Sequence, residues 1–272
     1  MSNPKRENPF PVLYVPHGGG PLPVLGDARH RKLVDFLHGV AADLPMPSAI
    51  LVVSAHWEET EPTLTSAARP ELFYDYRGFP PESYELRYPA PGDPRLAKEI
   101  QRLIEASGAS AKLDDTRGFD HGLFIPLLLM YPQARIPCLQ LSLLKSLDPA
   151  AHIALGKSIA ALRRQGVLIV GSGMSFHNLR ELFAANGKAN EACRQFDGWL
   201  RETCTDAKLS VLDREQRLIA WERAPAARFC HPREEHLLPL HVCYGAASVE
   251  SPIARVAFNE EVMGKTVTAL AW

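Results

Sequence analysis

The sequence of 272 residues predicts an α/β fold, a single domain with a central, mostly parallel sheet covered by helices. Short apolar runs bounded by proline or glycine have the composition of strands buried on both faces. Amphipathic segments with helix-start signals lie between these runs, and such alternation is typical of parallel strands joined by helices. Since no linker, charge block or repeat divides the chain, we expect one domain spanning residues 1–272.

The predicted elements alternate along the chain. Asp93 and Asp148 each precede a proline, a pair that caps a helix and fills its first position, and glycines at 108 and 166 end these two helices. A further amphipathic helix is expected over residues 33–44, after the first strand. The predicted strands cover residues 12–15, 49–54, 136–143 and 167–170.

The composition is that of a globular protein with almost no net charge. The chain has 30 Lys and Arg against 31 Asp and Glu, a formal charge of −1, which argues against binding to a nucleic-acid backbone. No apolar run approaches the roughly 18 residues that a membrane span needs. Residues 1–8 contain no apolar segment that would indicate a secretory signal, so we expect a cytoplasmic protein.

The segment of residues 73–91 does not fit the alternation. It is too aromatic for a linker and too rich in proline for a helix. Long excursions of this kind inside a domain are usually functional, although packing over an edge of the core would also explain the composition.

Three histidines lie just beyond predicted strands. His17 and His56 each follow a strand by two residues, and His177 comes after the strand at 167–170. The carboxyl ends of parallel strands meet at one edge of a sheet, where ligand sites gather. Neutral imidazole is a common ligand of iron and zinc. We therefore predict a metal site at the carboxyl ends of the strands.

A fourth candidate ligand is His236. Pro232 is expected to open a helix that places His236 near its start, and the neighbouring Glu235 is a rival ligand. Two histidines with a carboxylate would suit non-haem Fe(II), whereas three histidines with an open position would equally suit zinc. Residue spacing leaves both alternatives open.

Five further histidines are expected in other surroundings. His30, His38 and His152 lie on predicted helices among polar neighbours and are expected to face solvent. His241 points to another helix face than His236 and is expected to be packed. His121 lies in a glycine-flanked loop before an apolar helix, where contact with substrate and capping of the helix are both open.

Together these motifs resemble the class III extradiol ring-cleavage dioxygenases of the DOPA-dioxygenase type. The similarity runs through nearly the whole chain and includes residues 15–21, 53–58, 78–93, 118–122, 171–179 and 231–236. In this family the aromatic segment contributes to the substrate pocket, so the resemblance implies substrate contacts by Tyr84, Arg87 and Tyr88.

The resemblance also implies roles for five histidines. His17, His56 and His236 would hold the metal, expected to be Fe(II), although Zn(II) can occupy such sites. His177 matches the acid/base histidine, which can itself approach the metal when zinc is bound. His121 matches a histidine that bonds the substrate or oxygen.

The implied activity is extradiol cleavage of a catechol-type, DOPA-like aromatic ring with O2. The expected partners are a small-molecule catechol and O2, with neither nucleic acid nor membrane, and the oligomeric state stays open. Two alternatives remain: a non-catalytic relative that binds a metal or ligand, and a zinc-dependent hydrolase with Glu58, Glu234 or Glu235 as base.

Two segments depart from the family pattern. Residues 16–21 read Pro-His-Gly-Gly-Gly-Pro where Ser-His-Gly-Ser-Pro is usual. Residues 258–266 replace the usual Gly-Ser-Leu-Ser-Met ending, and we expect this second change to alter the pocket.

Overall fold

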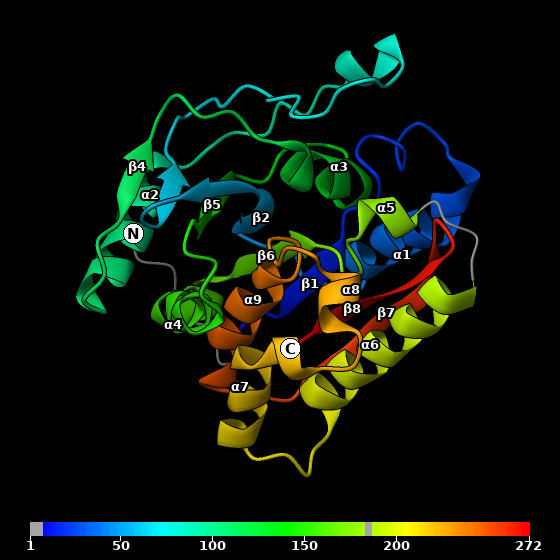
Figure 1. The fold of residues 1–272 in the computed structure, drawn as a ribbon. Coiled ribbons are helices and arrows are strands. Elements are labelled where there is room, and N and C mark those ends of the chain that lie inside the picture. The colour runs from blue at the N-terminus through cyan, green and yellow to red at the C-terminus, as the bar shows by residue number, and fades with distance from the viewer. Residues whose placement is uncertain (1–7, 183–186) are drawn as a thin grey trace.

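The computed structural model describes residues 8–182 and 187–272, so the prediction made on residues 1–8 lies almost wholly outside it. The described strands form one sheet in the order β4-β3-β5-β2-β6-β1-β8-β7, flanked by helices (Figure 1). The α/β fold class predicted from the sequence is confirmed. The strands are β1 (Val12–Pro16), β2 (Ala49–Glu59), β3 (Thr63–Thr65), β4 (Lys112–Asp114), β5 (Cys138–Leu144), β6 (Val167–Gly173), β7 (Arg255–Val262) and β8 (Lys265–Ala271).

Helices cover both faces of the sheet. In Figure 1, α1 and α3 lie on one face, and α4 and α9 on the other. Among the described helices, none is long and apolar enough to cross a membrane. The α-helices are α1 (Arg31–Ala42), α2 (Pro94–Ala106), α3 (His121–Met130), α4 (Pro149–Ile159), α5 (Leu179–Leu182), α6 (Gly187–Thr205), α7 (Val211–Ile219), α8 (Ala227–Cys230) and α9 (Leu238–Ser248). Short 3-10 turns are η1 (Ala28–His30), η2 (Pro81–Tyr84), η3 (Ala160–Gln165) and η4 (Trp221–Arg223).

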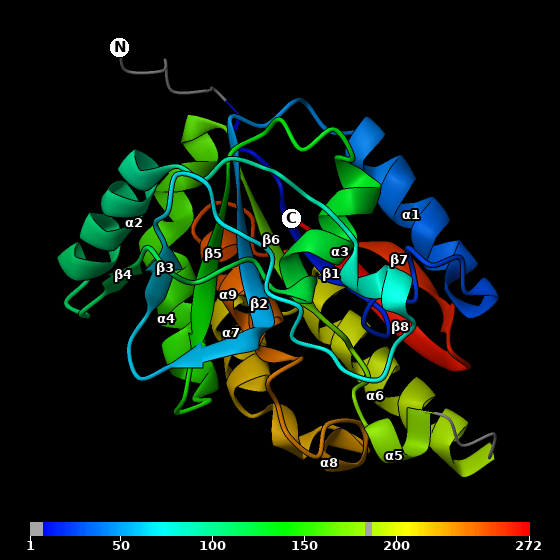
Figure 2. The same ribbon diagram turned by 90° about the horizontal axis from the view of Figure 1, so that it is seen from above.

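The four strands predicted from apolar runs form the parallel centre of the sheet. β6 pairs in parallel with β1 and with β2, and β2 pairs in parallel with β5. All residues of β1 and β6 are buried, as strands covered by helices on both faces require. Figure 2 shows this arrangement from above. The carboxyl ends of these strands therefore lie at the same edge of the sheet.

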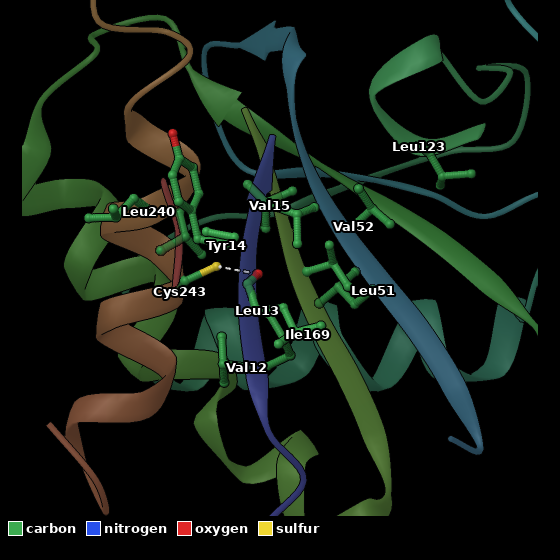
Figure 3. Close-up of a cluster of buried hydrophobic side chains, with 14 of the residues drawn as sticks. Val12, Leu13, Tyr14, Val15, Leu51, Val52, Leu123, Ile169, Leu240 and Cys243 are labelled. Carbon is green, nitrogen blue, oxygen red and sulfur yellow. Dashed lines mark hydrogen bonds between the residues drawn. The ribbon is translucent and has the colours of Figure 1, made fainter. Parts of the chain in front are cut away.

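The core links β1 to the segment that carries His236. Figure 3 shows Leu13 and Tyr14 on β1 beside Cys243 on α9, with the Cys243 thiol donating to the Leu13 carbonyl at 3.3 Å. The Tyr14 hydroxyl donates to the carbonyl oxygen of His236 at 3.0 Å. Burial of the core thus fixes the backbone at His236.

Glycines on β6 allow the backbone around His236 to come close to that strand. A Cβ atom on Gly173 would overlap the carbonyl oxygen of His236, and one on Gly171 would lie 2.6 Å from that of Pro239. The same His236 carbonyl accepts a hydrogen bond from the Met174 amide at 3.0 Å. The backbone before α9 therefore rests directly on the end of β6.

The outer strands were not predicted from the sequence. β8 pairs antiparallel with β1, and β7 and β8 form a hairpin. At its tip Met263 and Gly264 have positive φ angles of 52° and 77°. At the opposite edge, the short strand β3 pairs with β4 and β5.

The aromatic segment of residues 73–91 forms an extended excursion above the sheet in Figure 1. Its regular structure is limited to η2 (Pro81–Tyr84). The Tyr74 hydroxyl donates to the Leu86 carbonyl at 2.6 Å, and the Tyr76 hydroxyl donates to the Ser83 carbonyl at 2.5 Å. Tyrosine hydroxyls thus hold the excursion together from within.

Three expectations about histidines need correction. Pro232 opens no helix: α9 begins at Leu238, and His236 lies in the turn before it. His30 and His152 are buried rather than solvent-facing: the His30 ring accepts a hydrogen bond from the Gly19 amide, and the His152 ring accepts one from the amide of Leu144 at the end of β5.

Two other histidines lie where the sequence indicated. His38 is exposed on α1. His241 is packed inside α9, where its Nε2 lies 2.9 Å from the Leu218 carbonyl oxygen.

The close approach at Gly173 predicts a stability effect. Gly173→Ala should lower the free energy of unfolding by about 1–3 kcal/mol, because the added methyl group must displace the backbone at His236. Gly198→Ala is the matched control, since no atom lies within 4 Å of its Cβ position on α6 and alanine favours the helix. Urea unfolding measures both. Equal stability of Gly173→Ala and wild type would contradict the prediction.

Candidate metal centre

The structure brings His17, His56 and His236 together at the carboxyl edge of the sheet. His17 follows β1, His56 lies in the last part of β2, and His236 is held against the end of β6. The ring centroids are 4.8 Å apart for His17 and His56, 5.1 Å for His17 and His236, and 4.9 Å for His56 and His236. The three rings therefore form a nearly equilateral triangle.

The nitrogen atoms of this triangle face one another. Nε2 of His17 and Nε2 of His56 are 3.1 Å apart, and one ligand atom from each of the three residues lies within 4.8 Å of the others. Two nitrogens bound at about 2.1 Å to one ion, at right angles, would be about 3.0 Å apart. The spacing thus suits a shared metal ion.

The opposite nitrogen of each ring faces a protein oxygen. Nδ1 of His17 lies 3.1 Å from Ser172 Oγ, and Nδ1 of His236 lies 3.0 Å from Glu235 Oε1. Nδ1 of His56 lies 3.6 Å from Asp75 Oδ2. Such contacts orient an imidazole and place its proton on Nδ1, which leaves the Nε2 lone pair free for a metal.

Burial favours the neutral form of these imidazoles. It lowers the pKa of His17 and of His56 well below the usual value, with repulsion from neighbouring histidines adding to the effect. Burial, followed by repulsion from His177, lowers the pKa of His236 to about 3. At neutral pH all three rings are therefore unprotonated, which is the form that binds metals.

Two more histidines flank the triangle. The His121 ring lies 3.8 Å from the His56 ring, and the His177 ring stacks on His236 with centroids 3.3 Å apart and planes inclined by 15°. All five line one cavity. The structure thus gathers every histidine for which a site role was predicted.

Two carboxylates connect these histidines in pairs. Asp75 Oδ1 lies 2.7 Å from Nδ1 of His121, and the other oxygen of Asp75 faces His56. Glu235 Oε1 lies 3.0 Å from Nδ1 of His177 and 3.0 Å from Nδ1 of His236. Each carboxylate therefore joins one corner of the triangle to one flanking histidine.

Both carboxylates are held in the ionised form. Burial acts to raise the pKa of Asp75, but hydrogen bonds from His121 prevail and hold it below its usual value. Burial likewise opposes the shift at Glu235, where hydrogen bonds with His177 and His236 hold the pKa well below the usual range. Sequence reasoning missed Asp75, which is one acidic residue among the tyrosines of residues 73–91.

The cavity at this site has a volume of about 330 Å³, within the usual range for small-molecule sites. Its wall includes Tyr76, Phe79 and Met263, none of which was singled out from the sequence. The aromatic character of residues 73–91 was the signal available for the first two.

The three residues expected to contact substrate lie elsewhere. Arg87 and Tyr88 line a separate cavity, and the Tyr88 hydroxyl donates to the Tyr131 carbonyl at 3.2 Å. Tyr84 does not line the histidine cavity, although its ring lies 5.4 Å from that of Tyr76. The structure therefore brings none of them to the histidines.

Several known proteins are similar to this chain in sequence over most of its length. Dioxygenase tasH from Hapsidospora irregularis is 40% identical, over 96% of this chain and 85% of its own length. The 4,5-DOPA dioxygenase extradiol of Beta vulgaris is 37% identical, over 90% of both chains. A protein of the same name from Escherichia coli K12 is 35% identical, over 90% of this chain and 88% of its own length.

A solved structure and a family model extend this likeness. The crystal structure of an uncharacterised protein from Escherichia coli K12 superposes with a TM-score of 0.77 and 29% identity, over 96% of this chain and 99% of the other. The model of the catalytic LigB subunit of aromatic ring-opening dioxygenase matches residues 15–271. The resemblance seen in the sequence is thereby confirmed, and the chain belongs to the LigB family of aromatic ring-opening dioxygenases.

Proposed function

We propose that this ring-opening dioxygenase cleaves a catechol in the extradiol position, with Fe(II) held by His17, His56 and His236. The observation that carries the proposal is the triangle of neutral imidazoles, in which Nε2 of His17 lies 3.1 Å from Nε2 of His56 and one ring nitrogen of each residue lies within 4.8 Å of the others. Three nitrogen donors leave room for substrate and O2 beside the metal. The names of the DOPA-cleaving relatives support a catechol substrate. We further propose that the whole chain forms one catalytic domain.

Bound iron would supply the redox chemistry by which O2 attacks an aromatic ring. A three-histidine set also suits zinc, but zinc has no redox chemistry, so iron is the metal proposed for catalysis. Two of the three proposed ligands, His17 and His236, are buried, which limits the access of competing water.

His177 is the proposed acid/base residue. Its Nδ1 faces Glu235 at 3.0 Å, so the Nε2 lone pair is available to accept a proton from a substrate hydroxyl. The resulting imidazolium is stabilised by the ionised Glu235 carboxylate, in the manner of a carboxylate behind a catalytic histidine. The proton can then be returned from Nε2 as the ring opens.

His121 is proposed to hold the substrate or O2 by a hydrogen bond. Its Nδ1 faces Asp75 at 2.7 Å, and the Asp75 carboxylate also accepts a hydrogen bond from the His121 amide at 3.0 Å. These two contacts fix the ring and leave Nε2 toward reactants. We propose substrate contacts by Tyr76 and Phe79, which line the cavity, in place of Tyr84, Arg87 and Tyr88.

Oxygen uptake tests the proposed activity directly. Adding 4-alkylcatechols, DOPA or protocatechuate to anaerobically iron-loaded protein, and then O2, should consume one O2 per catechol and yield a yellow ring-opened product. Equimolar uptake without a yellow product would indicate a different cleavage. Failure of every catechol to consume O2 would contradict the proposal.

His56→Ala should abolish stoichiometric iron binding, because the remaining two imidazoles are too few to hold the ion. His38→Ala removes an exposed imidazole on α1 and should bind iron as wild type does. Metal analysis after gel filtration measures both. Retention of one equivalent of iron by His56→Ala would show that this residue is no ligand.

His177→Ala should keep its iron and lower kcat by about 10²–10⁴-fold, the usual contribution of a positioned acid/base group. Steady-state oxygen uptake and iron content are measured on the same sample. An iron-free variant would assign His177 to the metal instead, and an unchanged kcat would remove it from proton transfer.

A further inference from the structure

We propose that the catechol cleaved by this enzyme carries an uncharged, apolar substituent on its ring. The inference rests on the proposed function, because it takes the two catechol hydroxyls to be held at the histidine cluster. The rest of the substrate must then lie against the remaining walls of the same cavity, and these walls decide which substituents fit.

Those walls, as far as the structure describes them, offer no charged partner. Apart from the histidines, the described residues that line the cavity are glycines and apolar or aromatic residues, and none is Lys, Arg, Asp or Glu. The side chains include Leu22, Tyr76, Phe79, Leu179, Leu182 and Met263.

Tyr76 brings a phenol into these walls, but its hydroxyl is already hydrogen-bonded. The Tyr76 hydroxyl donates to the Ser83 carbonyl at 2.5 Å, within the aromatic segment itself. Its ring packs edge-on against Phe79, with centroids 5.5 Å apart, so the pair presents aromatic surface to the cavity.

The backbone conformation of Met263 is a second observation in favour of a ligand site at these walls. It sits at the tip of the β7–β8 hairpin with φ of 52°, and Gly264 follows with φ of 77°. Hairpin turns with two positive φ angles favour Asn, Asp or Gly, so methionine is strained there. Such outliers cluster at ligand sites.

The side chain of Met263 is nevertheless buried, with 6% exposed. It closes the cavity against the glycine loop, since a Cβ atom on Gly19 would lie 2.9 Å from its sulfur. Met263 belongs to residues 258–266, the segment that departs from the family pattern. Its side chain gives this segment an apolar, adaptable surface in the cavity wall.

A charged substituent would lose its hydration here without gaining an ion pair. Arginines are found in an adjoining cavity, which shares His177 and Leu179 with the first. Two of them are already paired: Arg228 with Glu222 and Glu234, and Arg233 with Glu58. The exposed Arg180 is the remaining arginine that lines it.

Binding to zinc-loaded protein separates charge from turnover. Calorimetric titration without O2 should show 4-butylcatechol binding at least about 10-fold more tightly than 3-(3,4-dihydroxyphenyl)propanoate or DOPA. It should also bind more tightly than unsubstituted catechol, since the butyl chain buries apolar surface. The kcat/KM values of iron-loaded protein should follow the same order.

The outcomes distinguish the two proposals. Equal or tighter binding of the propanoate or of DOPA, with ring cleavage intact, would overturn the apolar-substituent inference and leave the proposed function standing. If no catechol is bound or cleaved, the proposed function fails and the inference fails with it.

Variants at the rim test the wall itself. Leu179 is exposed, so Leu179→Arg should fold. This variant should bind the propanoate about 10-fold more tightly than wild type does, and its affinity for 4-butylcatechol should not increase. Leu179→Met should keep the wild-type order of affinities. Met263→Arg, with Met263→Leu as its control, repeats the test at the tip of the β7–β8 hairpin. Unchanged propanoate affinity in both arginine variants would contradict the assignment of these walls.

Arg180→Ala tests whether a charged tail reaches the adjoining cavity. The affinities of 4-butylcatechol and of the propanoate should stay within about twofold of wild type, because neither substituent is expected to extend past His177. A large loss of DOPA or propanoate binding would show that Arg180 receives a carboxylate, and would overturn the inference.

Discussion

The site depends on one electrostatic constraint, the clustering of three imidazoles that desolvation holds in the neutral form. Protonation would relieve the repulsion between the lone pairs of His17 and His56, but burial disfavours the charged form of each ring. A cation placed between them satisfies both demands. The core supplies the force that holds this arrangement: packing of α9 on β1 and β6 fixes the backbone of His236, and glycine at 173 lets it come close.

The two carboxylates complete the balance of charge. Asp75 and Glu235 stay ionised within the same cluster, and their two negative charges would offset a divalent cation in a region of low dielectric constant. Each carboxylate also contacts Nδ1 of a flanking histidine: Asp75 contacts His121, and Glu235 contacts His177. In the proposed mechanism, metal retention and proton transfer both depend on these two side chains, and the apolar walls govern which catechol reaches the site.

Much of the fold was predictable because local signals and tertiary structure agree. Buried parallel strands give apolar runs, and residues that follow them must meet at one edge, which locates His17, His56 and His177. The prediction of a helix start at Pro232 was wrong, since proline fits a turn as well as a helix start. No periodic pattern in the sequence shows where a long excursion or a hairpin packs in the fold. The positions of Asp75 and Met263 at the site could therefore be found only from the structure.

The claim that three histidines share one ion is tested most directly by X-ray absorption spectroscopy of the protein loaded with one equivalent of Fe(II). We predict a shell of three imidazole nitrogens at about 2.1 Å, completed by oxygen from water. A coordination shell with fewer than three imidazoles, or one in which His17→Ala leaves the imidazole count unchanged, would contradict it.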